Sequence, residues 1–125
     1  MLVADSSVWL ELVTDGPLAA RCAPFIADLA QVVTPTLVML EVYRVLRRRN
    51  EEHAAMRAVA EMENTRIVSV DALVAITAAE LSLDHGLSAA DAIIYATARL
   101  ERCELVTADA DFRGLLDVTV IEAEP

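Results

Sequence analysis

Short apolar runs rich in β-branched residues alternate along the chain with longer segments whose apolar residues recur every three or four positions. The short runs predict buried strands and the longer segments predict amphipathic helices, because these are the side-chain repeats of the two structures. The predicted strands are 1–4, 32–34, 67–70, 105–107 and 118–121. The predicted helices are 8–13, 18–30 with an interruption near Pro24, 36–49, 51–63, 72–85, 88–102 and 111–115. Strands alternating with helices favour a parallel sheet covered on both faces, an α/β fold.

The predicted helix ends carry residue types that cap helices. Thr36, Asp71 and Ser88 have side chains that can accept a hydrogen bond from a first-turn amide. Gly86 closes the helix that Asp71 begins. Asn50 stands at a break between two helices and therefore predicts a helical hairpin.

Length and hydropathy set the class of protein. At 125 residues and 13.5 kDa, the chain is sized for a single domain, 1–125. Hydrophobic residues make up 56% of it and the mean hydropathy is +0.45, which excludes disorder. The longest uncharged run, 29–40, contains Pro35 and falls short of the roughly 20 apolar residues of a membrane span. Asp5 and Glu11 stand where a secretory signal would be basic, so we expect a cytoplasmic protein with no membrane partner.

The balance of charged and metal-binding residues excludes several function classes. Twenty acidic residues against ten basic ones, all Arg, give a net charge of -10, which opposes nonspecific attraction to nucleic acid. The absence of Lys excludes Schiff-base and phosphate-loop lysines. Cys22 and Cys103 are isolated and predict reduced, buried thiols, while His53 and His85 predict solvated side chains. Zinc is therefore disfavoured.

Four acidic residues lie where an apolar residue or a cap is expected: Asp5, Glu41, Asp91 and Asp109. Asp5 and Asp109 directly follow predicted strands, and ligands bind at the carboxyl ends of strands in open α/β sheets. Glu41 lies within the apolar face of the predicted helix 36–49, and Asp91 lies one turn inside the predicted helix 88–102. If these carboxylates converge, their repulsion destabilises the fold unless a cation lies among them. Ligation by oxygen alone favours Mg²⁺, or Mn²⁺, over zinc.

Each of these acids also has a structural interpretation. Asp5 can cap the first helix, and Glu41 can pair with Arg44 on one helix face. The segment 88–91 matches a capping box, and the segment 107–111 is rich in turn-forming residues. Taken singly, none of the four identifies a site.

Taken together, the motifs resemble the PIN-domain family. They are Asp5-Ser6-Ser7-Val8, Glu41 inside a helix, Ser88-Ala89-Ala90-Asp91-Ala92 and Thr107-Ala108-Asp109-Ala110-Asp111-Phe112. The resemblance covers nearly the whole chain, and the length and the early first strand are more narrowly similar to VapC toxins of type II toxin-antitoxin pairs. It implies a three-layer α/β/α fold whose parallel sheet has strand order 3-2-1-4-5. The switch point of such a sheet lies between the first and fourth strands, where Asp5 and Asp109 would end.

The resemblance implies a Mg²⁺-dependent endoribonuclease. By carry-over, the catalytic and metal-binding pocket would consist of Asp5, Glu41, Asp91 and Asp109, with Asp111 a weaker member and Ser7 and Thr107 orienting waters or ligands. The ions would activate a water for in-line attack on the phosphodiester and leave 5′-phosphate and 3′-hydroxyl ends.

The resemblance also implies partners. VapC relatives form homodimers and are held inactive by a cognate VapB antitoxin whose tail lies across the groove. Trp9 and Tyr43 are candidates for an exposed apolar patch, although core packing is the favoured interpretation of Trp9, because a single Trp on an amphipathic segment is normally buried. Arg44 and Arg48 project to the same side of their helix as Glu41 and could contact RNA phosphates, the alternative being a solvated helix end.

The sequence also bears on three other function classes. A haloacid-dehalogenase phosphatase would need a second Asp at position 7 and a Lys, whereas the chain has Ser7 and no Lys. A serine hydrolase would need Gly rather than Ala90 in its nucleophile turn. A noncatalytic PIN-like module that binds protein or RNA stays open as the alternative to the nuclease.

Overall fold

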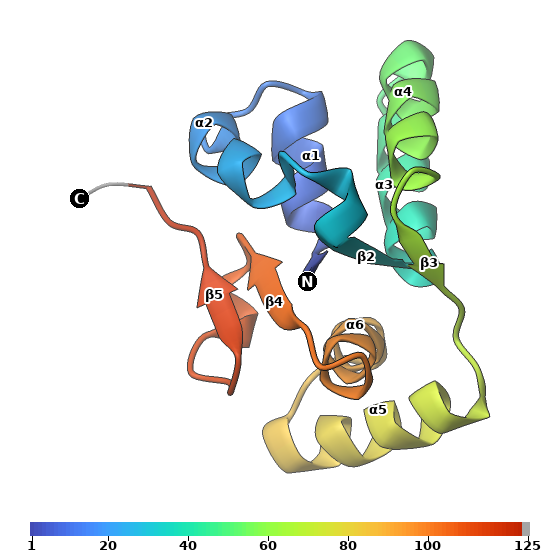
Figure 1. Ribbon diagram of the computed structural model, residues 1–125, viewed down its shortest axis with the longest axis vertical. Coiled ribbons are helices and arrows are strands. Elements are labelled where there is room, and N and C mark those ends of the chain that lie inside the picture. The colour runs from blue at the N-terminus through green and yellow to red at the C-terminus, as the bar shows by residue number, and fades with distance from the viewer. Residues whose placement is uncertain (124–125) are drawn as a thin grey trace.

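The computed structural model describes residues 1–123 and shows one parallel sheet surrounded by helices (Figure 1). Within these residues five strands pair in the order β3-β2-β1-β4-β5, all parallel to their neighbours. The strands are β1 (Leu2–Ala4), β2 (Val32–Pro35), β3 (Arg66–Val68), β4 (Glu104–Thr107) and β5 (Val118–Val120). The predicted α/β class and the strand order 3-2-1-4-5 are confirmed.

Six α-helices are described within residues 1–123. They are α1 (Ser6–Val13), α2 (Ala19–Cys22), α3 (Thr36–Arg48), α4 (Glu52–Met62), α5 (Ala72–His85) and α6 (Ala89–Leu100). Short 3₁₀ turns follow α2 at Ala23–Ile26 and Leu29–Gln31, and another follows β4 at Ala110–Phe112. No helix in this part of the chain has the length and apolarity that crossing a membrane requires.

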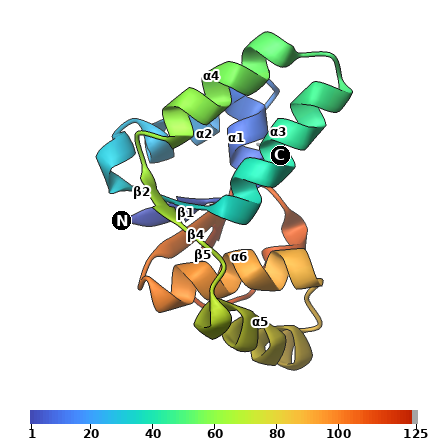
Figure 2. The same ribbon diagram turned by 90° about the vertical axis from the view of Figure 1, so that its right-hand side faces the viewer.

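The helices form two layers, one on each face of the sheet (Figure 2). Helices α1 to α4 lie on one face, and α6 covers the other face with α5 packed on its outer side. Because both faces are covered, the central strands are apolar almost throughout: Val3, Val33, Leu105 and Val106 are fully buried. The sheet and its two helical layers therefore share one core.

Helix α3 shows how the sequence pattern positions a polar group at the core. Val38, Val42 and Leu46 recur every four positions and are buried, which fixes the rotation of the helix against its neighbours. Glu41 precedes Val42 on the same helix and is consequently half-buried. After α3 the chain reverses at Asn50, which has a φ of 59°, so the predicted helical hairpin is confirmed.

Several predicted boundaries were wrong by one or two residues. Pro35 belongs to β2 and does not stop it, because Pro35 is paired in register with Val68 of β3. Pro35 is also the N-cap residue of α3, so Thr36 is the first helical residue and its side chain does not cap the helix. β3 ends at Val68 and not at the predicted residue 70, because β2 offers no pairing partner beyond Pro35. β5 ends at Val120, the register partner of Thr107. The predicted helix 111–115 is a 3₁₀ turn at Ala110–Phe112.

Several predictions about single side chains are settled. Trp9 is fully buried, so the core packing favoured from the sequence is confirmed and Trp9 is not part of an exposed patch, whereas Tyr43 is exposed. Cys22 and Cys103 are buried free thiols as predicted, and His53 and His85 are exposed as predicted.

Candidate functional site

The carboxyl ends of β1 and β4 bring together residues that are a hundred positions apart. β1 pairs directly with β4, and the amide of Asp5 extends this pairing by donating a 2.9 Å hydrogen bond to the carbonyl of Val106. Asp5 follows β1 and Asp109 follows β4, so the sheet order itself places both acids at one edge.

Asp5 is held in place by donors on both of its carboxylate oxygens. The Ser6 amide donates to Oδ1 at 2.8 Å, which makes Asp5 the N-cap of α1. The hydroxyls of Ser7 and Thr107 donate to Oδ2 at 3.0 and 2.7 Å. Only 4% of Asp5 is exposed to solvent, so the orientation of this carboxylate is fixed by burial and by these hydrogen bonds.

The same two hydroxyls organise the turn that follows β4. The Ser7 hydroxyl oxygen accepts a hydrogen bond from the Ala108 amide at 2.9 Å, and the Thr107 hydroxyl oxygen accepts one from the Asp109 amide at 2.9 Å. Each hydroxyl therefore donates to Asp5 and accepts from the turn. This arrangement suits the supporting role predicted for Ser7 and Thr107, which stays a prediction.

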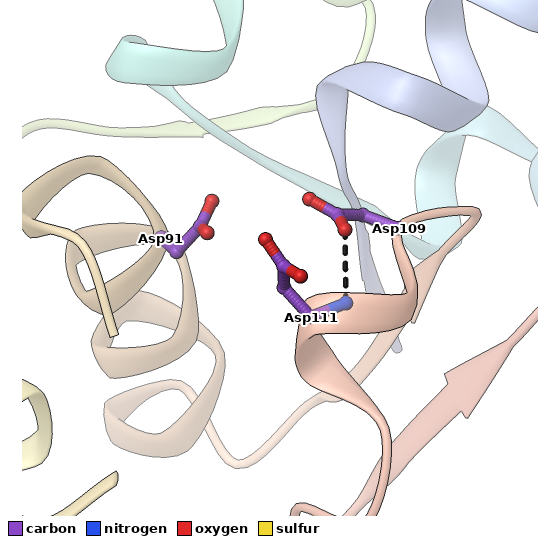
Figure 3. Close-up of side chains that lie close together, drawn as sticks. All are labelled: Asp91, Asp109 and Asp111. Carbon is purple, nitrogen blue, oxygen red and sulfur yellow. Dashed lines mark hydrogen bonds between the residues drawn. The ribbon is translucent and has the colours of Figure 1, made fainter. Parts of the chain in front are cut away.

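Asp91, Asp109 and Asp111 form the closest group of carboxylates (Figure 3). One oxygen from each lies within 4.8 Å of the others. Asp91 reaches the group from α6, and the other two come from the turn after β4, where Asp109 Oδ1 accepts from the Asp111 amide at 2.9 Å. Within the described residues this is the one group of three or more His, Cys, Asp or Glu side chains at metal-binding distance.

Glu41 approaches the other acids from α3 and carries an unpaired oxygen. Burial raises the pKa of Glu41, the charges of Asp5 and Asp91 raise it further, and a hydrogen bond from Ser6 and the charge of Arg44 oppose the change. Its Oε1 is buried without any hydrogen-bond partner. Buried polar atoms normally have a partner, so this oxygen is available to a cation or a donor that enters the site.

Asp5 and Asp91 also have raised pKa values, in part because the acids lie near one another. Burial raises the pKa of Asp5 more than its hydrogen bonds lower it, and the charge of Asp109 adds to the rise. Burial likewise raises the pKa of Asp91, followed by the charges of Asp109 and Asp5. Like charges gathered in a partly desolvated pocket disfavour their ionised forms, and a cation among them would relieve this repulsion.

The charges of the four acids predicted from the sequence act on one another, but Asp5 and Glu41 lie outside the group at metal-binding distance. The structural interpretations of Asp5 as a cap and of Asp109 as a turn former hold at the same time. Asp5 caps α1, and the Ser88 hydroxyl caps α6 by accepting from the Asp91 amide at 3.2 Å. Asp111, given a lesser place from sequence, belongs to the closest group. Ser6 was missed, although its position next to Asp5 in the first motif offered a signal.

The arginines beyond Glu41 differ in their surroundings. Arg44 lies one turn after Glu41 and is close enough for its charge to affect the Glu41 carboxylate. Arg47 donates to the Tyr43 hydroxyl at 2.9 Å, lies over the Tyr43 ring and pairs with Glu52 at 3.7 Å. Arg44 and Arg48 are exposed and lie one and two helical turns after Glu41 on α3.

Comparison with known proteins adds family evidence. A family model for the PIN domain matches residues 2–115, while no curated protein matches the chain. Among solved structures, a chain of a toxin-antitoxin complex from Klebsiella pneumoniae is 24% identical with a TM-score of 0.83, over 98% of both chains. The sarcin-ricin loop cleaving toxin VapC20 of Mycobacterium tuberculosis is 23% identical with a TM-score of 0.77, over 94% of this chain and 98% of that one. FitAcB from Neisseria gonorrhoeae is 22% identical with a TM-score of 0.73, over 98% and 97%. These chains share the fold.

Proposed function

The chain belongs to the PIN domain family, and from this we propose that it is a Mg²⁺-dependent endoribonuclease, the toxin of a VapBC toxin-antitoxin pair. The observation that carries the proposal is the group formed by Asp91, Asp109 and Asp111, with Asp5 and Glu41 near enough for their charges to act on its members or on each other. The similarity in fold to VapC20, described as a sarcin-ricin loop cleaving toxin, supports RNA as the substrate class.

The residues present fit a hard divalent ion. The donors are all carboxylate oxygens, which suit Mg²⁺ or Mn²⁺ rather than zinc. The unpaired Oε1 of Glu41 and the raised pKa values of Asp5 and Asp91 are the features expected of a pocket arranged around a cation. We assign ligation to Asp5, Glu41, Asp91 and Asp109, and Asp111 to the same pocket because its oxygen lies within 4.8 Å of those of Asp91 and Asp109.

When bound, Mg²⁺ would lower the pKa of a coordinated water and offset charge on the phosphate under attack. The chain's own contribution is position. Ser6, Ser7 and Thr107 hold both oxygens of Asp5, so the carboxylate keeps its orientation whether or not substrate is present. Ser7 and Thr107 also fix the turn that carries Asp109. A preorganised pocket of this kind needs little rearrangement when the charges of the reaction develop.

Arg44 and Arg48 are assigned to the RNA backbone. An acidic chain with a net charge of -10 needs local cations to hold a polyanion. These two side chains are exposed and lie one and two turns beyond Glu41 on α3, so phosphates that flank the reacting one can contact them.

The proposal includes two protein partners and a compartment. A cognate VapB-type antitoxin would inhibit the toxin by placing a basic residue against the acids, because opposite charges attract. Several of the similar structures are toxin-antitoxin complexes, which supports such a partner. A second copy of the chain would cover the apolar residues exposed on α5, Leu73, Ile76 and Leu83. We propose a cytoplasmic location, in keeping with an RNA substrate.

RNA cleavage tests the proposal directly. The purified chain is incubated with structured RNA in Mg²⁺ or EDTA beside Asp91→Asn and, as a matched control, Asp84→Asn, which changes an exposed acid on α5. We expect Mg²⁺-dependent cuts with 5′-phosphate ends from the wild type and the control, and a loss of at least about 100-fold in Asp91→Asn. Equal cleavage by all three proteins would identify a contaminant and favour the noncatalytic binding module.

A further inference from the structure

A cavity of about 440 Å³ opens beside the acidic group and is not used by the proposed reaction. It is lined by His85, Gly86, Leu87, Ser88, Asp91 and Asp111. Asp91 and Asp111 belong to the closest group of carboxylates, so the cavity adjoins the place where the scissile phosphate would lie. His85 is the last residue of α5, and Gly86, Leu87 and Ser88 form the connection to α6.

The turn that forms this wall is fixed by its own hydrogen bonds. Gly86 has a φ of 68° and its amide donates to the Ser82 carbonyl at 2.8 Å, which ends α5. The Ser82 hydroxyl donates to the carbonyl of Leu87 at 2.6 Å, and the Ser88 hydroxyl oxygen accepts from the Asp91 amide. Because these groups are satisfied within the turn, the cavity is formed before any ligand arrives.

His85 gives the cavity its one aromatic ring. The imidazole meets the ring of Tyr95 edge-on, with centroids 6.2 Å apart and planes at 75°. Tyr95 is itself buried and anchored, since its hydroxyl donates to the Leu116 carbonyl at 2.9 Å. Within residues 1–123 no hydrogen bond engages the imidazole nitrogens of His85. The ring is therefore supported by Tyr95 and remains able to stack on or hydrogen-bond to a ligand.

The lining selects between the parts of a nucleotide. The lining carries no arginine, and the carboxylates of Asp91 and Asp111 disfavour a phosphate unless a metal ion lies between them, so the scissile phosphate is expected at the metal and not against the part of the cavity lined by His85, Leu87 and Ser88. A nucleobase is uncharged, offers a flat face to an imidazole and presents N–H groups to carboxylate acceptors. The chemistry of the cavity thus matches a base and not a phosphate.

We propose that this cavity binds the nucleobase adjacent to the scissile phosphate and that His85 stacks on that base. The inference rests on the proposed ribonuclease function for its biological meaning, but it is a statement about binding. It assigns to the α5–α6 turn a part in choosing which nucleotide stands next to the cut.

Nucleoside binding measured without metal tests the site independently of cleavage. The ¹⁵N-labelled chain in EDTA is titrated with guanosine, adenosine, cytidine and uridine, and separately with inorganic phosphate, while amide shifts are followed. We expect saturable shifts at Gly86, Leu87 and Ser88 with at least one nucleoside and none with phosphate. Shifts with phosphate alone, or none at these amides with any nucleoside, would overturn the proposal.

Three variants of the two exposed histidines sharpen the test. His85→Ala should weaken nucleoside binding by at least about five-fold, because base-aromatic stacking is lost. His85→Phe, which retains a flat ring, should restore most of it, and His53→Ala on α4 should bind as the wild type does. Unchanged binding in His85→Ala contradicts the assignment.

Failure of the inference and failure of the proposed function give different results. If nucleosides bind at 86–88 but no RNA is cut in Mg²⁺, the nuclease proposal fails and the base site stands. If RNA is cut but His85→Ala retains the wild-type KM and cut positions, the base site is wrong and the nuclease stands.

Discussion

The hydroxyl of Thr107 donates a 2.7 Å hydrogen bond to the Asp5 carboxylate across 102 positions of sequence. It joins the ends of β1 and β4, the two strands between which the order of the sheet reverses. One fully buried hydroxyl therefore links the parallel pairing at the centre of the sheet to the geometry of the acidic pocket.

Replacing Thr107 by valine should uncouple the pocket from the sheet. Thr107→Val keeps the volume but removes a donor from Asp5 and an acceptor from the Asp109 amide, so we expect a loss of about 2 kcal/mol in unfolding free energy. Mn²⁺ affinity, measured by titration calorimetry, should fall by about 10- to 100-fold. Thr107→Ser retains the hydroxyl and serves as control; wild-type affinity in the valine variant would show that the hydroxyl does not position the site.

The metal-free protein should lose stability as the pH rises toward neutrality. The pKa values of Asp5, Glu41 and Asp91 are raised in the folded state above the ordinary 3.8 and 4.5, so the folded chain retains protons that the unfolded chain has released. This contribution to stability is fully present below the ordinary carboxyl pKa and is lost as the pH rises through the raised pKa values. Urea midpoints in EDTA across this range test the sign, and saturating Mg²⁺ should restore stability at neutral pH. A midpoint that rises with pH in EDTA contradicts it.

Neutralising Glu41 should stabilise the metal-free chain at neutral pH while weakening metal binding. Glu41→Gln removes a charge repelled by Asp5 and Asp91. Because the side chain is only half-buried, solvent screens this repulsion and limits the expected gain to about 1 kcal/mol, or about 4 °C in Tm. Thermal unfolding in EDTA measures the gain, and its reversal in Mg²⁺ reports the lost ligand. Glu80→Gln, an exposed acid on α5, should change neither.

Removing Arg44 and Arg48, the two α3 arginines assigned to the RNA backbone, should weaken RNA binding while all the acidic residues stay in place. Arg44→Gln with Arg48→Gln should reduce the salt dependence of RNA affinity by about two units of slope, one for each phosphate contact. Fluorescence anisotropy of a labelled RNA across salt concentrations measures the slope. Arg102→Gln changes an arginine in the connection before β4, at the opposite edge of the sheet, and should leave it unchanged. Equal slopes in all proteins would make the α3 arginines a solvated helix end.

Negative charges among the exposed apolar residues of α5 should prevent self-association. Leu83 and Ile76 are 81% and 67% exposed, so Leu83→Glu with Ile76→Glu alters the surface and should change stability by no more than about 0.5 kcal/mol. Light scattering after size exclusion should show a dimer for the wild type and a monomer for the double variant. A wild-type monomer, or a variant that remains dimeric, rules out this face as the contact.

Local physics in the sequence determined the elements of this protein. β-branched runs gave β1, β2 and β4, and the side chains of Asp71 and Ser88 marked helix starts that the structure confirms, because caps and apolar repeats act over a few residues. Boundaries that depend on a distant partner could not be found this way: β3 ends at Val68 only because β2 ends at Pro35.

The acidic pocket was visible in the sequence as misplaced charges, and the resemblance to a family supplied their common location. Tertiary structure alone decided how they meet. It brought Asp111 into the closest group, left one oxygen of Glu41 buried without a partner, and set His85 against Tyr95 beside the acids. A sequence specifies which groups a chain carries and which faces they occupy, but distances between separate elements are set by strand pairing and helix packing over the whole fold.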